Sequence, residues 1–193
     1  MAKRAVATIV VILAVVMVLV GPAAGMVVGA PSHQTYSFGV PLLVMDVVLQ
    51  PDGSASIIYD ITFSNYGSPI DIIDIGTPTD VYNLNAMEAS IDGVALSDIR
   101  TSEYIDTGVE IHLGSNAIPS GGTRTLHLEF AISDLVYADT TNDANASFQI
   151  TPTWFETVQG TGDIEIRVAT LPGVAPDAVL YQDVPFTDKI QDK

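Results

Sequence analysis

The sequence predicts an all-β fold, an antiparallel β-sandwich of the immunoglobulin- or fibronectin-like kind, preceded by an N-terminal hydrophobic helix. Three observations predict it. Apolar and polar residues alternate with period two from residue 36 onward, turn-forming residues separate these runs, and outside the N-terminus no stretch carries the apolar stripe of an amphipathic helix. Two packed sheets allow each such strand to bury one face and to solvate the other.

The strongest strand signal covers Ala55–Ser64. Its alternate residues are apolar and share one face: Ala55, Ile57, Tyr59, Ile61 and Phe63. The apolar run Leu43–Leu49 precedes it, and Gln50-Pro51-Asp52-Gly53 between them supplies the Pro and Gly of a tight turn. We expect the two runs to form an antiparallel hairpin.

The same pattern of short apolar runs and turns repeats downstream. Asp92-Gly93 favours a tight turn with positive φ, and Ser133–Ala138 is either a strand extension or one helical turn. His112 and His127 fall on two runs that we expect to be neighbouring strands. The further expected strands are Ile70–Ile75, Met87–Ile91, Val94–Leu96, Gly108–Leu113, Thr123–Ile132, Ser147–Thr151 and Ile164–Leu171.

The N-terminus carries an export signal. Lys3 and Arg4 are followed by apolar residues without a charge as far as Gly29, which predicts insertion with the N-terminus inside. Ala23-Ala24-Gly25 resembles a cleavage site, whereas Met26-Val27-Val28 extends the apolar run to a length that spans a bilayer. Residues 1–28 are therefore a cleaved signal peptide or a retained signal anchor, residues 29–37 a linker, and residues 38–193 one extracytoplasmic domain.

Composition restricts the partners. The chain has 23 Asp and Glu against 7 Lys and Arg, a formal net charge of −16, so nucleic acid and anionic lipid surfaces are repelled. The membrane is a partner through the N-terminal helix, and the domain is expected to meet other envelope proteins or surface glycans. Cysteine is absent, so the core must hold the fold without disulfides.

Catalytic signals are few. His112 and His127, with Glu110 and Glu129 nearby in the sequence, fall short of the three or four converging ligands of a zinc site, and we expect both imidazoles to face water. No Gly-x-Ser-x-Gly elbow or Ser-x-x-Lys pair supplies a nucleophile. The sequence therefore predicts that the chain is not an enzyme, that it has no catalytic residues and that it needs no cofactor, calcium being the one exception to consider.

The calcium candidate is the loop that follows Ala138. Four short oxygen-bearing side chains lie within it: Asp139, Asn142, Asp143 and Asn145. Oxygen ligands suit Ca²⁺, but the loop lacks the central Gly and the closing Glu of an EF-hand. An acidic turn without a ligand is the simpler interpretation. Trp154, the sole tryptophan, is expected to fill the core, and an exposed interface position is the alternative.

Several short motifs resemble those of prokaryotic membrane-anchored β-sandwich ectodomains of unknown function. They are Asp52-Gly53-Ser54, Ile118-Pro119-Ser120-Gly121-Gly122 before Leu126-x-Leu128-x-Phe130, and Thr151-Pro152-Thr153-Trp154-Phe155 leading to Leu171-Pro172-Gly173-Val174. The resemblance covers about residues 44–175. It implies a second hydrophobic segment after the sandwich, and because the given sequence reaches Lys193 without one, a truncated reading frame is one interpretation.

The functional expectation is an exported domain, membrane-anchored or secreted, that serves as a cell-surface binding or structural module. The alternatives are an extracytoplasmic hydrolase and a calcium-dependent carbohydrate-binding module. A binding module predicts an exposed apolar or aromatic patch, whereas a hydrolase predicts that His112 or His127 converges with acids in a concave pocket.

Overall fold

The computed structural model describes residues 36–171, 173–174, 178, 180–181 and 184–185. The expected signal segment 1–28 and most of the linker 29–37 lie outside these residues. The described part is built mainly of β-strands, with two short 3₁₀ turns, η1 (Leu84–Ala86) and η2 (Gly114–Asn116). Within it we find no helix with the length and apolar character needed to cross a membrane.

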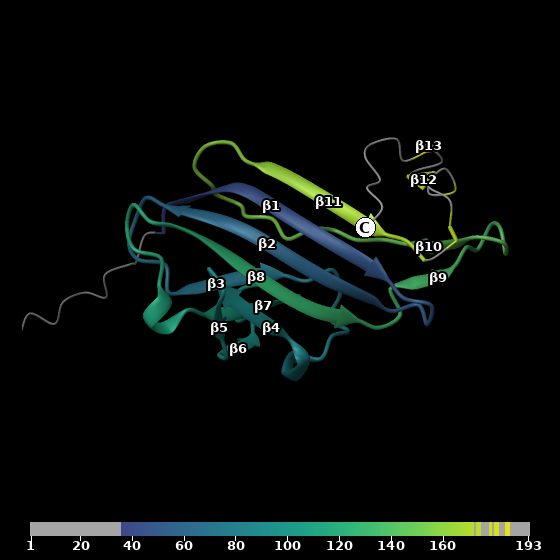
Figure 1. The fold of residues 1–193 in the computed structure, drawn as a ribbon, viewed down its shortest axis with the longest axis horizontal. Helices are drawn as coiled ribbons and strands as arrows, with labels where there is room; N and C mark the ends of the chain where they lie inside the picture. The colour runs from purple at the N-terminus through teal and green to yellow at the C-terminus, as the bar shows by residue number, and fades with distance from the viewer. Residues whose placement is uncertain (1–35, 172, 175–177, 179, 182–183, 186–193) are drawn as a thin grey trace, which may run out of the picture. The chain divides into compact units, whose positions relative to one another are not determined.

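The strands form two principal sheets and two small hairpins (Figure 1). One sheet has six strands in the order β11-β1-β2-β8-β4-β5, and another has three in the order β3-β7-β6. The bounds are β1 (Phe38–Leu49), β2 (Ala55–Asn65), β3 (Ile72–Gly76), β4 (Glu88–Ile91), β5 (Val94–Leu96), β6 (Ile99–Thr101), β7 (Gly108–His112), β8 (Thr123–Ile132), β9 (Val136–Ala138), β10 (Ala146–Phe148), β11 (Asp163–Ala169), β12 (Leu180–Tyr181) and β13 (Val184–Pro185).

The predicted hairpin is confirmed. β1 and β2 pair antiparallel from Leu49 opposite Ala55 to Phe38 opposite Asn65, and Gly53 in the connecting turn has a φ of 85°. The predicted inward face of β2 is buried throughout, from Ala55 to Phe63. Period-two alternation therefore located this strand and its core face correctly.

The expectation of a wholly antiparallel architecture is wrong at one edge. β11 runs parallel to β1, with Leu43 opposite Ile164 and Val47 opposite Val168. The reason lies in the long connection between residues 132 and 163, which holds the small β9–β10 hairpin and brings the chain back to the far side of β1. A long crossover of this kind permits parallel pairing, which a tight hairpin cannot make.

The two strands that carry His112 and His127 are not neighbours. β7 pairs with β3 and β6, whereas β8 pairs with β2 and β4. The segment between them contains η2 and a bridge from Ile118 to Ile70, and it carries the chain from one sheet to the other. The expectation that these two strands are neighbours is therefore wrong, because the segment between them is a crossover.

The two sheets share one hydrophobic core. β1, β2 and β8 contribute one set of side chains to it, and β3 and β7 contribute Ile73, Ile75, Val109 and Ile111. Each fully buried side chain of this kind stabilises the fold by about 1.5–3 kcal/mol through removal of apolar surface from water. The tight turn at Asp92-Gly93 is confirmed by φ angles of 49° and 79°, and Ser133–Ala138 ends in β9 after a turn.

Candidate functional site

Trp154 lies on the surface, so the expectation that it fills the core is wrong. Its side chain is 70% exposed. Its neighbours point the other way: Thr153 is buried, and the Phe155 ring lies 5.7 Å from the Phe38 ring and 5.5 Å from the Phe63 ring, centroid to centroid. In an extended segment successive side chains face opposite sides, so the inward positions of Thr153, which is buried, and Phe155, which is partly buried, turn Trp154 outward.

Two hydrogen bonds fix this segment on the core. The buried hydroxyl of Tyr59 accepts a hydrogen bond from the Thr153 backbone N–H at 3.0 Å, and the Thr153 hydroxyl accepts one from the Gly76 N–H at 3.0 Å. Thr153 is thereby tied to both sheets, because Tyr59 belongs to β2 and Gly76 to β3. Burial also raises the pKa of the Tyr59 phenol to about 12, so the hydroxyl stays neutral at physiological pH.

Trp154 borders a shallow apolar hollow of about 170 Å³. The hollow lies beside the start of β1 and of β11, and it is lined by Val40, Leu43, Thr153, Trp154, Phe155, Val158, Gly162 and Ile164. The backbone beside the hollow is held tightly in place. The Gln159 N–H donates to the Phe38 carbonyl at 2.7 Å, and a methyl group at Gly162 would collide with the Val40 carbonyl oxygen.

The apolar surface continues from the hollow along β11. Ile164 is 62% exposed although it lies on the same face of the sheet as its buried partner Leu43. Ile166 follows on this face opposite buried Met45. At this edge of the sheet the core-facing side extends beyond the part that is buried, and it leaves large apolar side chains in contact with water.

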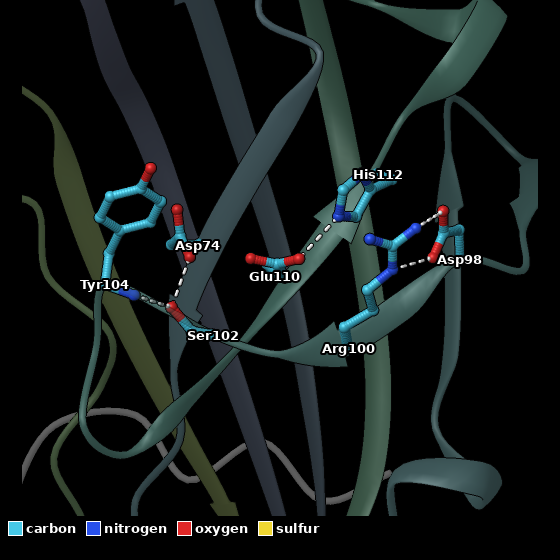
Figure 2. Close-up of polar contacts among 7 residues, drawn as sticks. All are labelled: Asp74, Asp98, Arg100, Ser102, Tyr104, Glu110 and His112. Atoms are coloured by element: carbon cyan, nitrogen blue, oxygen red, sulfur yellow. Dashed lines mark hydrogen bonds and ion pairs between the residues drawn. The ribbon is translucent and has the colours of Figure 1, made fainter.

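A second cluster, drawn in Figure 2, lies on the three-stranded sheet. Glu110 on β7 is buried and receives a hydrogen bond or ion pair from His112, with Nε2 and Oε1 2.8 Å apart. In the strand register Asp74 lies opposite Glu110 on one side and Arg100 on the other. Arg100 binds Asp98 through two nitrogens, at 2.7 Å each, and these bonds hold the pKa of Asp98 below its usual range.

The Ser102 hydroxyl beside this cluster is already engaged. Ser102 donates to Asp74 Oδ1 at 2.5 Å and accepts from the backbone N–H groups of Tyr104 and Ile105 (Figure 2). These bonds order the turn between β6 and β7, and they orient the hydroxyl toward Asp74 and away from His112. The geometry is that of a structural turn.

The two histidines do not converge. His127 on β8 binds Asp60 of β2, with Nδ1 and Oδ1 2.8 Å apart, and both side chains are near half-exposed. Glu129 receives a bond from Ser56 at 3.4 Å. His127, 40% exposed at its side chain, faces water as predicted. His112 is 22% exposed, because it is held against Glu110, so it faces water only in part. The described residues hold no group of three or more His, Asp or Glu placed to bind a metal.

The proposed calcium loop connects β9 to β10 and closes on itself. Asp139 Oδ1 accepts three hydrogen bonds, from the Thr141 hydroxyl and N–H and from the Asn142 N–H, and those from Thr141 hold the pKa of Asp139 below its usual range. Asn142 Oδ1 accepts from the Ala144 N–H, and the Asn145 N–H donates to the Asn142 carbonyl. Asp143 is exposed. The loop brings these side chains into one turn, and calcium binding stays a prediction.

Comparison with known proteins finds no matching family model and no matching curated protein. Among solved structures, a two-domain M1 zinc metallopeptidase with bound L-tryptophan is similar over 55% of this chain and 23% of its own, at 16% identity and a TM-score of 0.39. An M1 zinc metallopeptidase from Deinococcus radiodurans matches at 17% identity and a TM-score of 0.36, covering 52% of this chain and 21% of its own. Native leukotriene A4 hydrolase from Saccharomyces cerevisiae matches at 14% identity and a TM-score of 0.38, covering 52% of this chain and 16% of its own.

These neighbours are enzymes, which contradicts the prediction that the chain is not an enzyme. The chain spans less than a quarter of the length of the first of them. With TM-scores below 0.5, the likeness assigns neither an activity nor a zinc site to this chain.

Proposed function

We propose that the chain is an exported binding module of the cell envelope, an immunoglobulin-like sandwich that the N-terminal segment either anchors to the membrane or releases after cleavage. Its recognition surface is the hollow at Trp154. The partner is another envelope protein that inserts an apolar or aromatic side chain there.

The exposed Trp154 carries this proposal. Exposure of an indole and of Val158 and Ile164 around one hollow keeps a large apolar area in contact with water. A bound partner removes that area from water, and Trp is the residue type most often found to dominate such contacts. The hydrogen bonds that hold Thr153 mean that the indole is presented on a fixed backbone, which lowers the entropic cost of binding.

The lining of the hollow favours a protein partner over a sugar. Its side chains are almost all apolar, and the hydroxyls of a sugar placed there would lose water without gaining hydrogen-bond partners. The formal net charge of −16 adds a preference for a partner with a basic rim, because opposite charge accelerates encounter.

Photo-crosslinking in producing cells tests this function. A photoreactive residue placed at Val158, which lines the hollow, is expected to give one adduct of defined mass, and Trp154→Ala is expected to abolish it. The same residue at Tyr137, which is exposed on β9 and outside the hollow, serves as the matched control. Equal adducts at both positions, or none at Val158, would overturn the proposal.

A hydrolase is the second candidate, and the pairing of buried Glu110 with His112 favours it. A carboxylate that orients an imidazole is a recurrent arrangement for general base catalysis. A hydrolytic activity that disappears in His112→Ala but persists in His127→Ala would place the chemistry at this pair. A calcium-dependent carbohydrate-binding module rests on the Asp139 loop and predicts that calcium raises the melting temperature of the chain.

A further inference from the structure

β11 is an edge strand whose outer side is open among the described residues. In the six-stranded sheet it pairs with β1 alone, in parallel, while β1 pairs on its other side with β2 (Figure 1). The open side of such a strand presents backbone N–H and C=O groups that can add a further strand. Natural edges are commonly protected by charged residues, especially Lys, or by Pro. Asp163–Ala169 contains no Lys or Pro, and its three charged residues, Asp163, Glu165 and Arg167, all lie on one face.

The side chains of β11 separate into two kinds by face. Ile164, Ile166 and Val168 lie on the face of the sheet that bears Leu43, Met45 and Val47, as the register with β1 shows. Glu165 and Arg167 lie on the other face, opposite Val44 and Asp46. The strand is therefore apolar on one side and carries two acids, Asp163 and Glu165, and one base, Arg167, on the other.

We propose that two copies of this chain pair β11 with β11, antiparallel and centred on Ile166. In this register Ile166 lies opposite Ile166 of the second copy, and Ile164 lies opposite Val168. On the other face Glu165 lies opposite Arg167 of the second copy, and the two-fold axis makes this pair twice. Cross-strand pairs of opposite charge and pairs of β-branched residues both stabilise antiparallel sheets.

Several registers place the apolar side chains of one copy opposite those of the other, and the charges select this one among them. Centring on Glu165 would bring Asp163 opposite Arg167 but would also place Glu165 opposite itself, and centring on Arg167 would place Arg167 opposite itself. Like charges directly opposite are destabilising, and centring on Ile166 creates no such pair. Arg167 already binds Asp46 through Nε at 2.6 Å, which holds the guanidinium along the sheet. Because a guanidinium has five N–H donors, others remain for Glu165 of the second copy.

The dimer goes beyond the proposed binding function, because it combines two recognition surfaces in one assembly. A two-fold axis perpendicular to the sheet leaves both Trp154 hollows on the same side of one continuous sheet. Two linked sites on one surface raise the apparent affinity for a partner that presents two anchors.

Disulfide cross-linking in the full chain tests the pairing, and the absence of native cysteine removes any background. Residues opposite each other in an antiparallel pair have Cα atoms about 4.5–5.5 Å apart, within the range of a disulfide. Ile166→Cys is therefore expected to give a disulfide-linked dimer on mild oxidation. Ile164→Cys is the control, because the two copies of residue 164 would lie about 13 Å apart along the strands, beyond disulfide reach.

A charge variant separates this register from chance collision. Adding Glu165→Arg to Ile166→Cys places a guanidinium opposite Arg167 of the second copy, and we expect the cross-linked fraction to fall about tenfold. Adding Asp163→Arg to Ile166→Cys makes the same charge change opposite Ala169 of the second copy, and we expect the cross-linked fraction to stay unchanged. The mixture of the Glu165→Arg and Arg167→Glu chains, each with Ile166→Cys, is expected to restore cross-linking between them.

Circular dichroism of each variant confirms that the strands have formed. Equal cross-linking by Ile164→Cys and Ile166→Cys, or equal effects of Glu165→Arg and Asp163→Arg in folded chains, would overturn the pairing. Neither outcome bears on the Val158 adduct, so failure of the dimer and failure of the proposed function remain distinguishable.

Discussion

The Tyr59 hydroxyl accepts a hydrogen bond from the backbone N–H of Thr153 across 94 residues of sequence, at 3.0 Å. This bond joins the centre of β2 to the segment that presents Trp154. Both ends are buried, so the bond forms where water cannot replace it. The position of the exposed indole therefore depends on a phenol inside the core.

Replacement of Tyr59 by Phe tests that dependence. The ring is retained, but the Thr153 N–H loses its acceptor, and a buried donor without a partner costs about 1–3 kcal/mol. We expect the free energy of unfolding to fall by that amount in denaturant titration. The fluorescence of Trp154, the one tryptophan of the sequence, should become easier to quench as its backbone loosens. Tyr137→Phe, at an exposed phenol, should change neither quantity.

Alkaline pH provides an independent test of the same group. Desolvation by burial raises the pKa of Tyr59 from 10.0 to about 12, so folding favours the neutral phenol. The contribution of the neutral Tyr59 phenol to the free energy of unfolding is complete below pH 10. It is lost as the pH rises from 10 to about 12, because the phenol ionises first in the unfolded chain. We expect wild type to lose about 2–3 kcal/mol more than Tyr59→Phe across this range. The pKa of Tyr36 is also raised to about 12, chiefly by desolvation, but it titrates in both chains. Parallel stability curves for the two chains would contradict the role of Tyr59.

Period two located the strands and their inner faces because alternation is a local property. The face of β8 from Leu126 to Ile132 and that of β2 are buried as predicted. Alternation in Thr153-Trp154-Phe155 allows either Trp154 or Phe155 to face the core, so it does not decide between them. In the structure the Phe155 ring packs against Phe38 and Phe63, and Trp154 therefore faces outward.

The pairing of strands could not be predicted in the same way. Whether β7 meets β8 depends on the crossover through Ile118, and whether β11 joins β1 depends on a connection of some thirty residues. Contacts between distant segments leave no period in the sequence. For that reason the partners of His112 and His127, and the open edge at β11, were not predictable from residue spacing.

The two imidazole–carboxylate pairs should differ in energy although their distances are equal, at 2.8 Å. The Glu110 side chain is 10% exposed, whereas that of Asp60 is 44% exposed. His112→Ala leaves a buried carboxyl without its partner and should cost about 1–3 kcal/mol. His127→Ala should cost about 0–1 kcal/mol, since water replaces the lost bond. Chemical denaturation of both variants measures the difference. Adding Glu110→Gln to His112→Ala should recover part of the lost stability, since a neutral amide is less costly to bury than a carboxylate. Equal losses in the two single variants would show that burial of Glu110 does not matter.

Calcium binding at the Asp139 loop can be separated from its turn geometry by a matched variant. Asp52 accepts bonds from the Ser54 N–H and hydroxyl, the same arrangement that Asp139 makes with Thr141. If the loop binds calcium, the ion should stabilise the fold by about 2.7 kcal/mol at a hundred times its dissociation constant. Asp139→Asn should abolish this gain in thermal denaturation, whereas Asp52→Asn should retain it. A melting temperature that does not respond to millimolar calcium, or that responds equally in both variants, would exclude the site.

Gly162 decides how closely the start of β11 approaches β1. A methyl group there would overlap the Val40 carbonyl oxygen, which is backbone and cannot rotate away. We expect Gly162→Ala to displace the strand, to lower the free energy of unfolding by about 1–3 kcal/mol and to shift the emission of Trp154, because Val40 and Gly162 both line its hollow. Gly160→Ala is the comparison. It places a side chain at a φ of +80° with open space around it, so it should cost about 1 kcal/mol through backbone strain alone and leave the emission unchanged. Identical spectra for Gly162→Ala and wild type would mean that the hollow does not depend on this backbone contact.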